Sequence, residues 1–150
     1  MKKFFLFLVF LLLLLISLLP WKSVLVITDG NVEKIYPLGE HEITIEYIHS
    51  VERSKVIETL NVNESGIYAT GMKWKDFGAG LPEDFQVLNG SWYEKRINIY
   101  LGKELDYWFI PLNHANITVD GSLTFAPRED TLIKFRVESC SILLIEIRGC

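Results

Sequence analysis

Hydrophobic residues form one unbroken block near the start of the chain. Residues 4–19 contain a single polar side chain, Ser17, and two lysines, Lys2 and Lys3, precede the block. As a helix, these sixteen residues would span ~24 Å, against a membrane hydrocarbon core of about 30 Å. The pattern predicts a transmembrane or signal-anchor helix within residues 1–21, with its positively charged start in the cytoplasm.

The same leader has an alternative interpretation as a cleavable signal peptide, which would leave a secreted protein. A cleavable signal ends in small residues, whereas Pro20-Trp21-Lys22-Ser23 is bulky and Val24-Leu-Val-Ile27 already has the pattern of a strand. We therefore expect a retained, single-pass anchor in the cell membrane. Residues 22–150 would then form one extracytoplasmic domain, because they are too few for two substantial cores.

Beyond the leader, polar and apolar residues alternate with the period of two that is typical of β-strands. The alternation is clearest over residues 42–50. Three dipeptides that favour tight hairpin turns separate such runs: Asp29-Gly30, Asn89-Gly90 and Asp120-Gly121. No window after Trp21 has a convincing helical period. The chain is therefore predicted to be all-β, as a single β-sandwich or a partly open β-barrel.

Charge narrows the range of partners. The whole chain carries 15 basic and 19 acidic residues, a net charge of −4. Two of the basic residues lie in the leader, so the part from Lys22 onward has 13 basic and 19 acidic residues, a net charge of −6. Such a surface repels nucleic acid and anionic lipid. We expect a membrane, reached through the leader, and other proteins as partners, and no nucleic acid.

The chain has two cysteines, Cys140 and Cys150, separated by a segment, residues 142–147, that has the pattern of a strand. Ten residues of strand would hold the two sulfurs ~33 Å apart. A disulfide requires Cα atoms within roughly 7 Å. We therefore expect two unpaired thiols, or an intermolecular bridge through Cys150 at the chain end.

The densest cluster of polar side chains is Tyr47-Ile-His-Ser-Val-Glu52, with Glu58 following. His49, Glu52 and Glu58 are a plausible ligand set for a divalent metal ion. Side chains of a continuous strand alternate between faces, so the three converge only if the chain bends after His49. The alternative is a strand end at which His49 hydrogen-bonds a backbone carbonyl and Glu52 is solvated.

Ser50 is a candidate nucleophile, with His49, His114 or His41 as its base. Adjacent strand side chains diverge, so His49 is poorly placed to serve Ser50, and no G-x-S-x-G turn surrounds the serine. The catalytic residues therefore stay unknown at this level.

The stretch Phe77-Gly-Ala-Gly-Leu-Pro82 is a second unusual feature. Gly78 and Gly80 allow positive φ and close backbone approach, and Pro82 fixes the exit of the chain. The stretch suits a tight corner between strands or, less specifically, a cradle for an anion. It lacks the third glycine of a dinucleotide-binding fingerprint. A further candidate, Tyr107-Trp108-Phe109, fits a core, a recognition surface or a membrane interface.

Together, the stretches around His49 and Gly78 resemble a prokaryotic family catalogued as domain of unknown function 1850. They match in order and spacing, and the likeness extends loosely over residues 24–147. The resemblance implies a small exported protein, often encoded beside permeases of tripartite ATP-independent periplasmic (TRAP) transporters of the TAXI type. It establishes no catalytic role. The positions that it marks as candidate binding residues are His49, Ser50, Glu52, Glu58, Gly78, Gly80 and Pro82.

The leading hypothesis is a membrane-anchored extracytoplasmic β domain without a cofactor, acting as a binding or accessory protein linked to a TRAP-type transporter. Its partner would be the permease or the solute-binding subunit. The competing hypothesis is an exported hydrolase or metal-binding enzyme using His49, Glu52 and Glu58. A third possibility is that the two motifs simply pack against each other.

Overall fold

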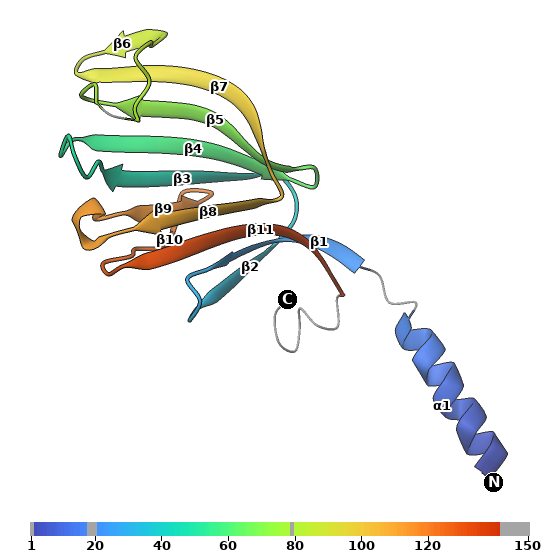
Figure 1. Ribbon diagram of the computed structural model, residues 1–150. Helices are drawn as coiled ribbons and strands as arrows, with labels where there is room; N and C mark the ends of the chain where they lie inside the picture. The colour runs from blue at the N-terminus through green and yellow to red at the C-terminus, as the bar shows by residue number, and fades with distance from the viewer. Residues whose placement is uncertain (1, 18–20, 79, 142–150) are drawn as a thin grey trace.

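The structure, a computed structural model, describes residues 2–17, 21–78 and 80–141 and consists of one helix followed by a β domain (Figure 1). The helix, α1 (Lys2–Ser17), has 16 residues and a length of ~24 Å. Among the described residues, no helix is long and apolar enough to cross a membrane. Residues 18–20, which complete the apolar block, lie outside the described part.

The β domain consists of two antiparallel sheets. The larger has seven strands in the order β10-β9-β3-β4-β5-β7-β6, and the smaller has four in the order β2-β1-β11-β8. The larger sheet comprises β3 (His41–Ile48), β4 (Lys55–Asn63), β5 (Gly66–Trp74), β6 (Val87–Asn89), β7 (Trp92–Gly102), β9 (Asn116–Val119) and β10 (Ser122–Phe125). The smaller comprises β1 (Trp21–Thr28), β2 (Glu33–Pro37), β8 (Glu104–Phe109) and β11 (Thr131–Ser141), and the short 3-10 helix η1 (Pro111–Asn113) joins β8 to β9.

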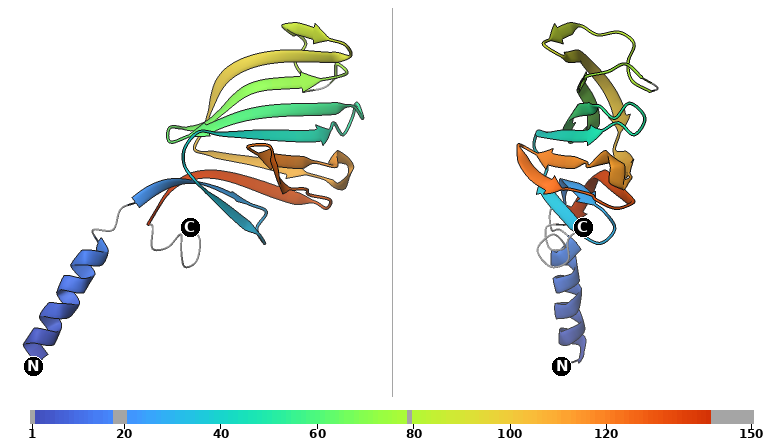
Figure 2. Two further views of the ribbon diagram at one scale, coloured as in Figure 1. Left: turned by 180° about the vertical axis from the view of Figure 1, so that it is seen from behind. Right: turned by 90° about the vertical axis from the view of Figure 1, so that its left-hand side faces the viewer.

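One hydrophobic core lies between the two sheets. Alternate residues of β3, such as Ile43 and Ile45, meet Leu25 of β1 and Phe135 of β11 there, and all four are fully buried. Burying one face of each sheet against the other is the arrangement of a β-sandwich. The prediction of an all-β domain is confirmed, with two open sheets. Helix α1 lies apart from this core, and the large side chains of residues 4–12 are exposed (Figure 2).

The predicted hairpin turns are present where the sequence placed them. Asp29-Gly30 lies between β1 and β2, Asn89-Gly90 between β6 and β7, and Asp120-Gly121 between β9 and β10. Asp120 and Gly121 have φ of 50° and 77°. Positive φ at both central residues is what a type I′ turn requires, and it matches the twist of the flanking strands.

The prediction of an unpaired thiol at Cys140 is wrong, because Cys140 is disulfide-bonded. That prediction assumed a strand continuing through residues 142–147. The predicted strand and Cys150 lie outside the described residues.

An ion pair between His41 and Asp120 links the β9–β10 turn to the start of β3. His41 Nδ1 lies 2.7 Å from Asp120 Oδ2, and His41 Nε2 lies 2.9 Å from the carbonyl oxygen of Pro37. Asp120 Oδ1 also accepts from the backbone N–H of Glu42 at 3.0 Å. Since both partners of the imidazole are acceptors, both bonds form together only when the ring is doubly protonated.

This pair should make stability depend on pH. Burial alone would lower the pKa of His41, but the bonds to Pro37 and Asp120 outweigh it and raise the pKa above 6.5. The bond from His41 lowers the pKa of Asp120 below 3.8. The contribution of His41 to stability is complete below pH 6.5 and is lost as the pH rises through the raised pKa of His41. The contribution of Asp120 to stability is lost as the pH falls through the lowered pKa of Asp120.

We therefore expect the His41–Asp120 pair to stabilise the fold most between pH 3.8 and pH 6.5. Asp120→Asn, which still suits the turn, should lower the pKa of His41 in an NMR titration. It should cost about 0.5 kcal/mol of unfolding free energy near pH 6, a small amount because solvent screens the half-exposed carboxylate. An unchanged titration of His41 in the variant would contradict the assignment.

Candidate functional site

The two motifs singled out in the sequence lie at the same end of the β domain. Strands β3 and β5 are both antiparallel to β4, so they run in the same direction and finish at the same end of the larger sheet. The turn of residues 49–54 follows β3, and the loop of residues 75–86 follows β5. This end, which we call the motif end, is opposite to the end at which β1 begins and α1 is attached (Figure 1).

The chain bends sharply just after His49. The backbone N–H of His49 donates to the Ser54 carbonyl at 2.8 Å, and Arg53 donates to the His49 carbonyl at 3.0 Å, with Arg53 at a φ of 56°. The backbone N–H of Glu52 donates to Nδ1 of the His49 ring at 3.3 Å. The histidine therefore accepts from the backbone instead of donating to a carbonyl, which leaves Nε2 as the protonated nitrogen of the neutral ring.

The glycine stretch is a tight corner that contacts this turn. Leu81 donates its N–H to the Gly78 carbonyl at 3.1 Å, and its buried side chain packs with Val56 and Trp74. A Cβ added to Gly78 would lie 2.2 Å from Cγ of Glu52. Glycine is therefore required at this position for Glu52 to lie as it does. The two motifs therefore contact each other through Glu52 and Gly78, whereas the sequence had offered His49 and Glu58 for such a contact only as a third possibility.

Two alanine substitutions, at Gly78 and at Gly80, distinguish the effect of the contact with Glu52 from the effect of backbone strain. Gly78→Ala would push the flexible Glu52 side chain aside, and we expect a cost of about 1 kcal/mol with NMR shifts at His49. Gly80→Ala is the matched control, because its φ of +84° is strained for alanine but nothing lies within 4 Å of the added Cβ. It should cost about 1 kcal/mol without disturbing His49. Equal shifts at His49 in both variants would mean that the Gly78 contact does not couple the motifs.

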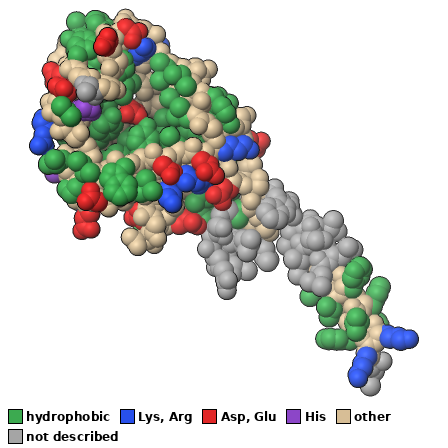
Figure 3. Space-filling view, in the orientation of Figure 1, with side chains coloured by type: hydrophobic (Ala, Val, Ile, Leu, Met, Phe, Trp, Pro, Cys, Tyr) green, Lys and Arg blue, Asp and Glu red, His purple; other side chains and the backbone are tan. Residues whose placement is uncertain are grey.

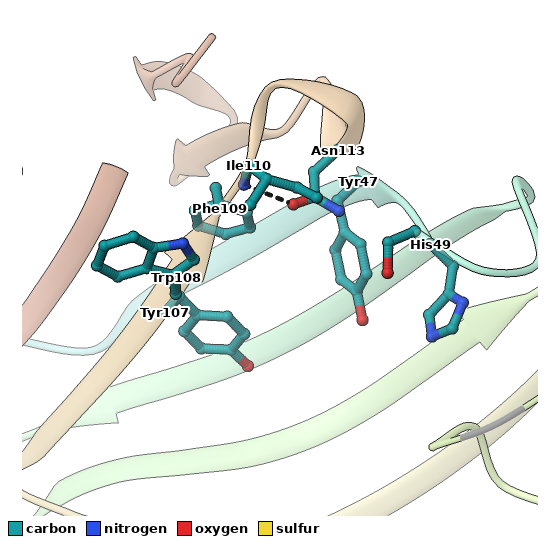
Figure 4. A pocket seen from close by; sticks show the side chains of 8 residues that line it. Tyr47, His49, Tyr107, Trp108, Phe109, Ile110 and Asn113 are labelled. Atoms are coloured by element: carbon teal, nitrogen blue, oxygen red, sulfur yellow. Dashed lines mark hydrogen bonds between the residues drawn. The ribbon is translucent and has the colours of Figure 1, made fainter. Parts of the chain in front are cut away.

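A pocket of about 330 Å³ opens at the motif end between the two sheets (Figure 4). Its wall comes from β3, from β8 and from the segment after each. The residues that line it are Tyr47, His49, Ser50, Tyr107, Trp108, Phe109, Ile110 and Asn113. Asn113 holds this wall together, because its side chain accepts from the Ile110 N–H at 2.8 Å and donates to the Ile48 carbonyl at 2.9 Å. Of the predicted site residues, His49 and Ser50 line the pocket directly.

Glu58 lies behind the pocket on the inner face of β4. It alternates with Val56 and Leu60, which are both buried, so its half-buried side chain is directed toward the core. Tyr47 donates its hydroxyl to Oε1 at 2.7 Å, and Tyr107 donates its hydroxyl to Oε2. Figure 4 shows the two hydroxyls pointing the same way from neighbouring elements. This tyrosine–glutamate bridge (Tyr47, Glu58, Tyr107) connects the larger sheet to the smaller one.

Both tyrosines of the bridge stay protonated over the whole physiological range. Burial raises the pKa of Tyr47 and of Tyr107 well above 10.0, and the negative charge of Glu58 raises both pKa values further. Two neutral donors therefore face one carboxylate.

The catalytic arrangements considered for the sequence are not assembled among the described residues. No group of three or more His, Cys, Asp or Glu side chains there is placed to hold a metal ion, so His49, Glu52 and Glu58 do not form one. His41 lies at the far end of β3 from Ser50. His114 lines a separate pocket of about 210 Å³. The described hydrogen bonds include none between Ser50 and a histidine.

Sequence reasoning identified part of this site. It named His49 and Ser50, and it offered Tyr107-Trp108-Phe109 as a possible recognition surface, all of which line the pocket. It missed the pairing of Tyr47 and Tyr107 with Glu58 and the role of Asn113. One signal was available, because a carboxylate two residues from both Val56 and Leu60 occupies a core position of an alternating strand.

Fold and site together define a two-sheet β domain with an aromatic pocket at one end. The family model described as a domain of unknown function (DUF1850) matches residues 43–125, more than half of the chain, and the chain belongs to this family. The matched segment runs from β3 to β10 and contains both motifs and all eight residues that line the pocket. No curated protein and no solved structure matches the chain.

Proposed function

We propose that this chain is an exported binding protein, held at the membrane by its N-terminal segment and accessory to a TRAP-type solute transporter. The observation that carries the proposal is that both motifs meet at the motif end through Glu52 and Gly78, and that the first of them lines an aromatic pocket there with His49 and Ser50. Surface pockets with aromatic walls and a few fixed polar groups are the usual form of a binding site.

The exposed helix supports attachment to a membrane. All nine large hydrophobic side chains of residues 4–12 are 41–70% exposed, so α1 needs an apolar environment that the β domain does not provide. Two lysines at its start favour the cytoplasmic side for the N-terminus. A tether of this kind keeps the domain at high effective concentration near other membrane components.

The position of the motif end favours a particular partner. Strand β4 has nine residues, so the pocket lies ~30 Å from the end of the domain at which α1 is attached. Exposed hydrophobic side chains also gather there, at Val51, Phe77, Trp108 and Leu112. Such clusters mark protein interaction sites. A solute-binding subunit outside the membrane is better placed to reach this end than a permease embedded in it.

The proposal can be tested by co-purification. The full chain would be affinity-purified from membranes of cells that express the transporter subunits. Trp108→Ala, in the lining of the pocket, should reduce recovery of the partner about tenfold, because exposed aromatic residues often carry much of an interface energy. Leu123→Ala is the matched control, since Leu123 on β10 is 64% exposed against 63% for Trp108.

Recovery of no transporter subunit with the unsubstituted chain would contradict the proposal, as would equal loss in both variants. The alternative, an exported hydrolase or metal-binding enzyme using His49, Glu52 and Glu58, is distinguished by metal analysis of protein purified without chelator. A stoichiometric metal that is lost in His49→Ala would favour it.

A further inference from the structure

Among the residues that the structure describes, the carboxylate of Glu58 has two hydrogen-bond partners and no positively charged partner. The ion pairs within the described residues number six, and none includes Glu58. Tyr47 and Tyr107 are neutral donors and occupy two of the roughly four acceptor positions of a carboxylate. Taking a carboxylate out of water without a cation is costly. The charge therefore lies at a core position of the sandwich without full compensation.

Aromatic side chains separate this carboxylate from the pocket, because Tyr47 and Tyr107 line the pocket and donate to Glu58. Tyr107 and Phe109 stack with ring centroids 5.8 Å apart and planes 9° apart, and Tyr47 meets Phe109 edge-on at 6.4 Å. All three line the pocket, as does the exposed Trp108. The face of an aromatic ring carries partial negative charge and attracts a cation. The rings and the carboxylate thus favour a positively charged ligand over a negatively charged one.

No lysine or arginine is among the residues that line the pocket. An anionic ligand would meet the charge of Glu58 without a basic partner, whereas a cation would compensate it. The volume of about 330 Å³ is at the low end for ligand sites, which suits a small head group. Figure 3 shows a hollow toward the motif end with hydrophobic side chains around it, so the region is open to solvent.

We infer that this pocket binds an organic cation, a primary ammonium or guanidinium group, with the tyrosine–glutamate bridge supplying the negative charge and the aromatic walls the contact surface. The group is either a free small amine or the side chain of a lysine or arginine in a partner protein. The inference rests on the proposed function in taking the pocket as the binding site. The inference of a cation site is tested without the transporter, so it can fail while the proposed function holds, and the proposed function can fail while the cation site holds.

The experiment is an NMR titration of the full chain in a non-ionic detergent with methylguanidinium and with its neutral isostere N-methylurea. Methylguanidinium should bind at least tenfold more tightly and shift the signals of His49, Tyr107 and Asn113. Glu58→Gln should abolish the preference for the cation. Tyr68→Phe, which removes a tyrosine hydroxyl on β5 outside the pocket, should retain the preference.

Two outcomes would overturn the inference: equal affinity for the charged and neutral probes, or a preference that survives Glu58→Gln. The comparison of the two probes on the unsubstituted chain decides the matter even where a variant does not fold. A third titration distinguishes the sources of the cation. A blocked peptide, acetyl-Ala-Arg-Ala-amide, that binds tenfold more tightly than methylguanidinium would indicate a partner side chain, and equal affinity would indicate a free small cation.

Discussion

Trp74→Ala is expected to lower the free energy of unfolding by about 3–5 kcal/mol, the range for removing a large aromatic side chain from a packed core. Trp74 is fully buried and packs with Val56 and Leu81. Its ring also meets Phe77 and Tyr93, with centroids 6.3 and 6.1 Å away. The cavity left by alanine lies directly beneath the glycine corner, so the loop of residues 77–82 should lose its support at the same time.

Chemical denaturation of the full chain in detergent, followed by circular dichroism, measures this effect. Trp74→Phe is the informative companion. The indole Nε1 is buried and has no hydrogen-bond partner within the described structure, so phenylalanine removes no hydrogen bond and should cost less than about 1.5 kcal/mol. A cost for Trp74→Phe equal to that of Trp74→Ala would mean that the indole N–H has a partner in solution.

Glu58→Ala is expected to cost about 2–4 kcal/mol, because two tyrosine hydroxyls that donate to the carboxylate lose their acceptor together. Leaving a buried donor unsatisfied costs about 1–3 kcal/mol. The lower part of the combined range applies here, since Tyr47 and Tyr107 are half-buried and water can reach them in part.

A double-mutant cycle isolates the bridge. Tyr107→Phe should cost about 1 kcal/mol in the natural chain and close to nothing when Glu58 is already alanine. Tyr68→Phe is a suitable control, because Tyr68 is also half-buried on a strand but packs against Tyr100 and makes no contact with Glu58. Equal costs of Tyr107→Phe in both backgrounds would mean that the hydroxyl and the carboxylate do not interact.

Local features of the sequence predicted much of the fold. Alternation over residues 42–50 predicted β3, and the Asp-Gly and Asn-Gly dipeptides predicted three hairpin turns, because both signals depend only on neighbouring residues. The order of strands in the two sheets is not local. Strand β11 pairs with β1 and with β8, and that pairing is what carries Tyr107 across the core to Glu58. No pattern within either strand specifies it.

Two predictions depended on assumptions about continuity. The expectation of an unpaired thiol at Cys140 assumed a strand running past Ser141, and it is wrong because Cys140 is disulfide-bonded. The alternative of a metal site, which the sequence left open, required His49, Glu52 and Glu58 to converge after a bend. The bend is present, but Glu52 turns toward Gly78 and Glu58 toward two tyrosines on the inner face of the sandwich. A bend is therefore not enough to bring side chains from two faces of a sheet together.

Site-specific photocrosslinking in intact cells tests directly whether the motif end is the surface that binds the transporter. A photoreactive residue would replace Val51, which is 67% exposed in the turn at the motif end, or Ser65, which is exposed in the turn at the other end of β4. If the motif end is the binding surface, position 51 should give a crosslinked transporter subunit and position 65 should give none. A crosslink from position 65 alone, or none from either position, would contradict the assignment of the motif end as the binding surface.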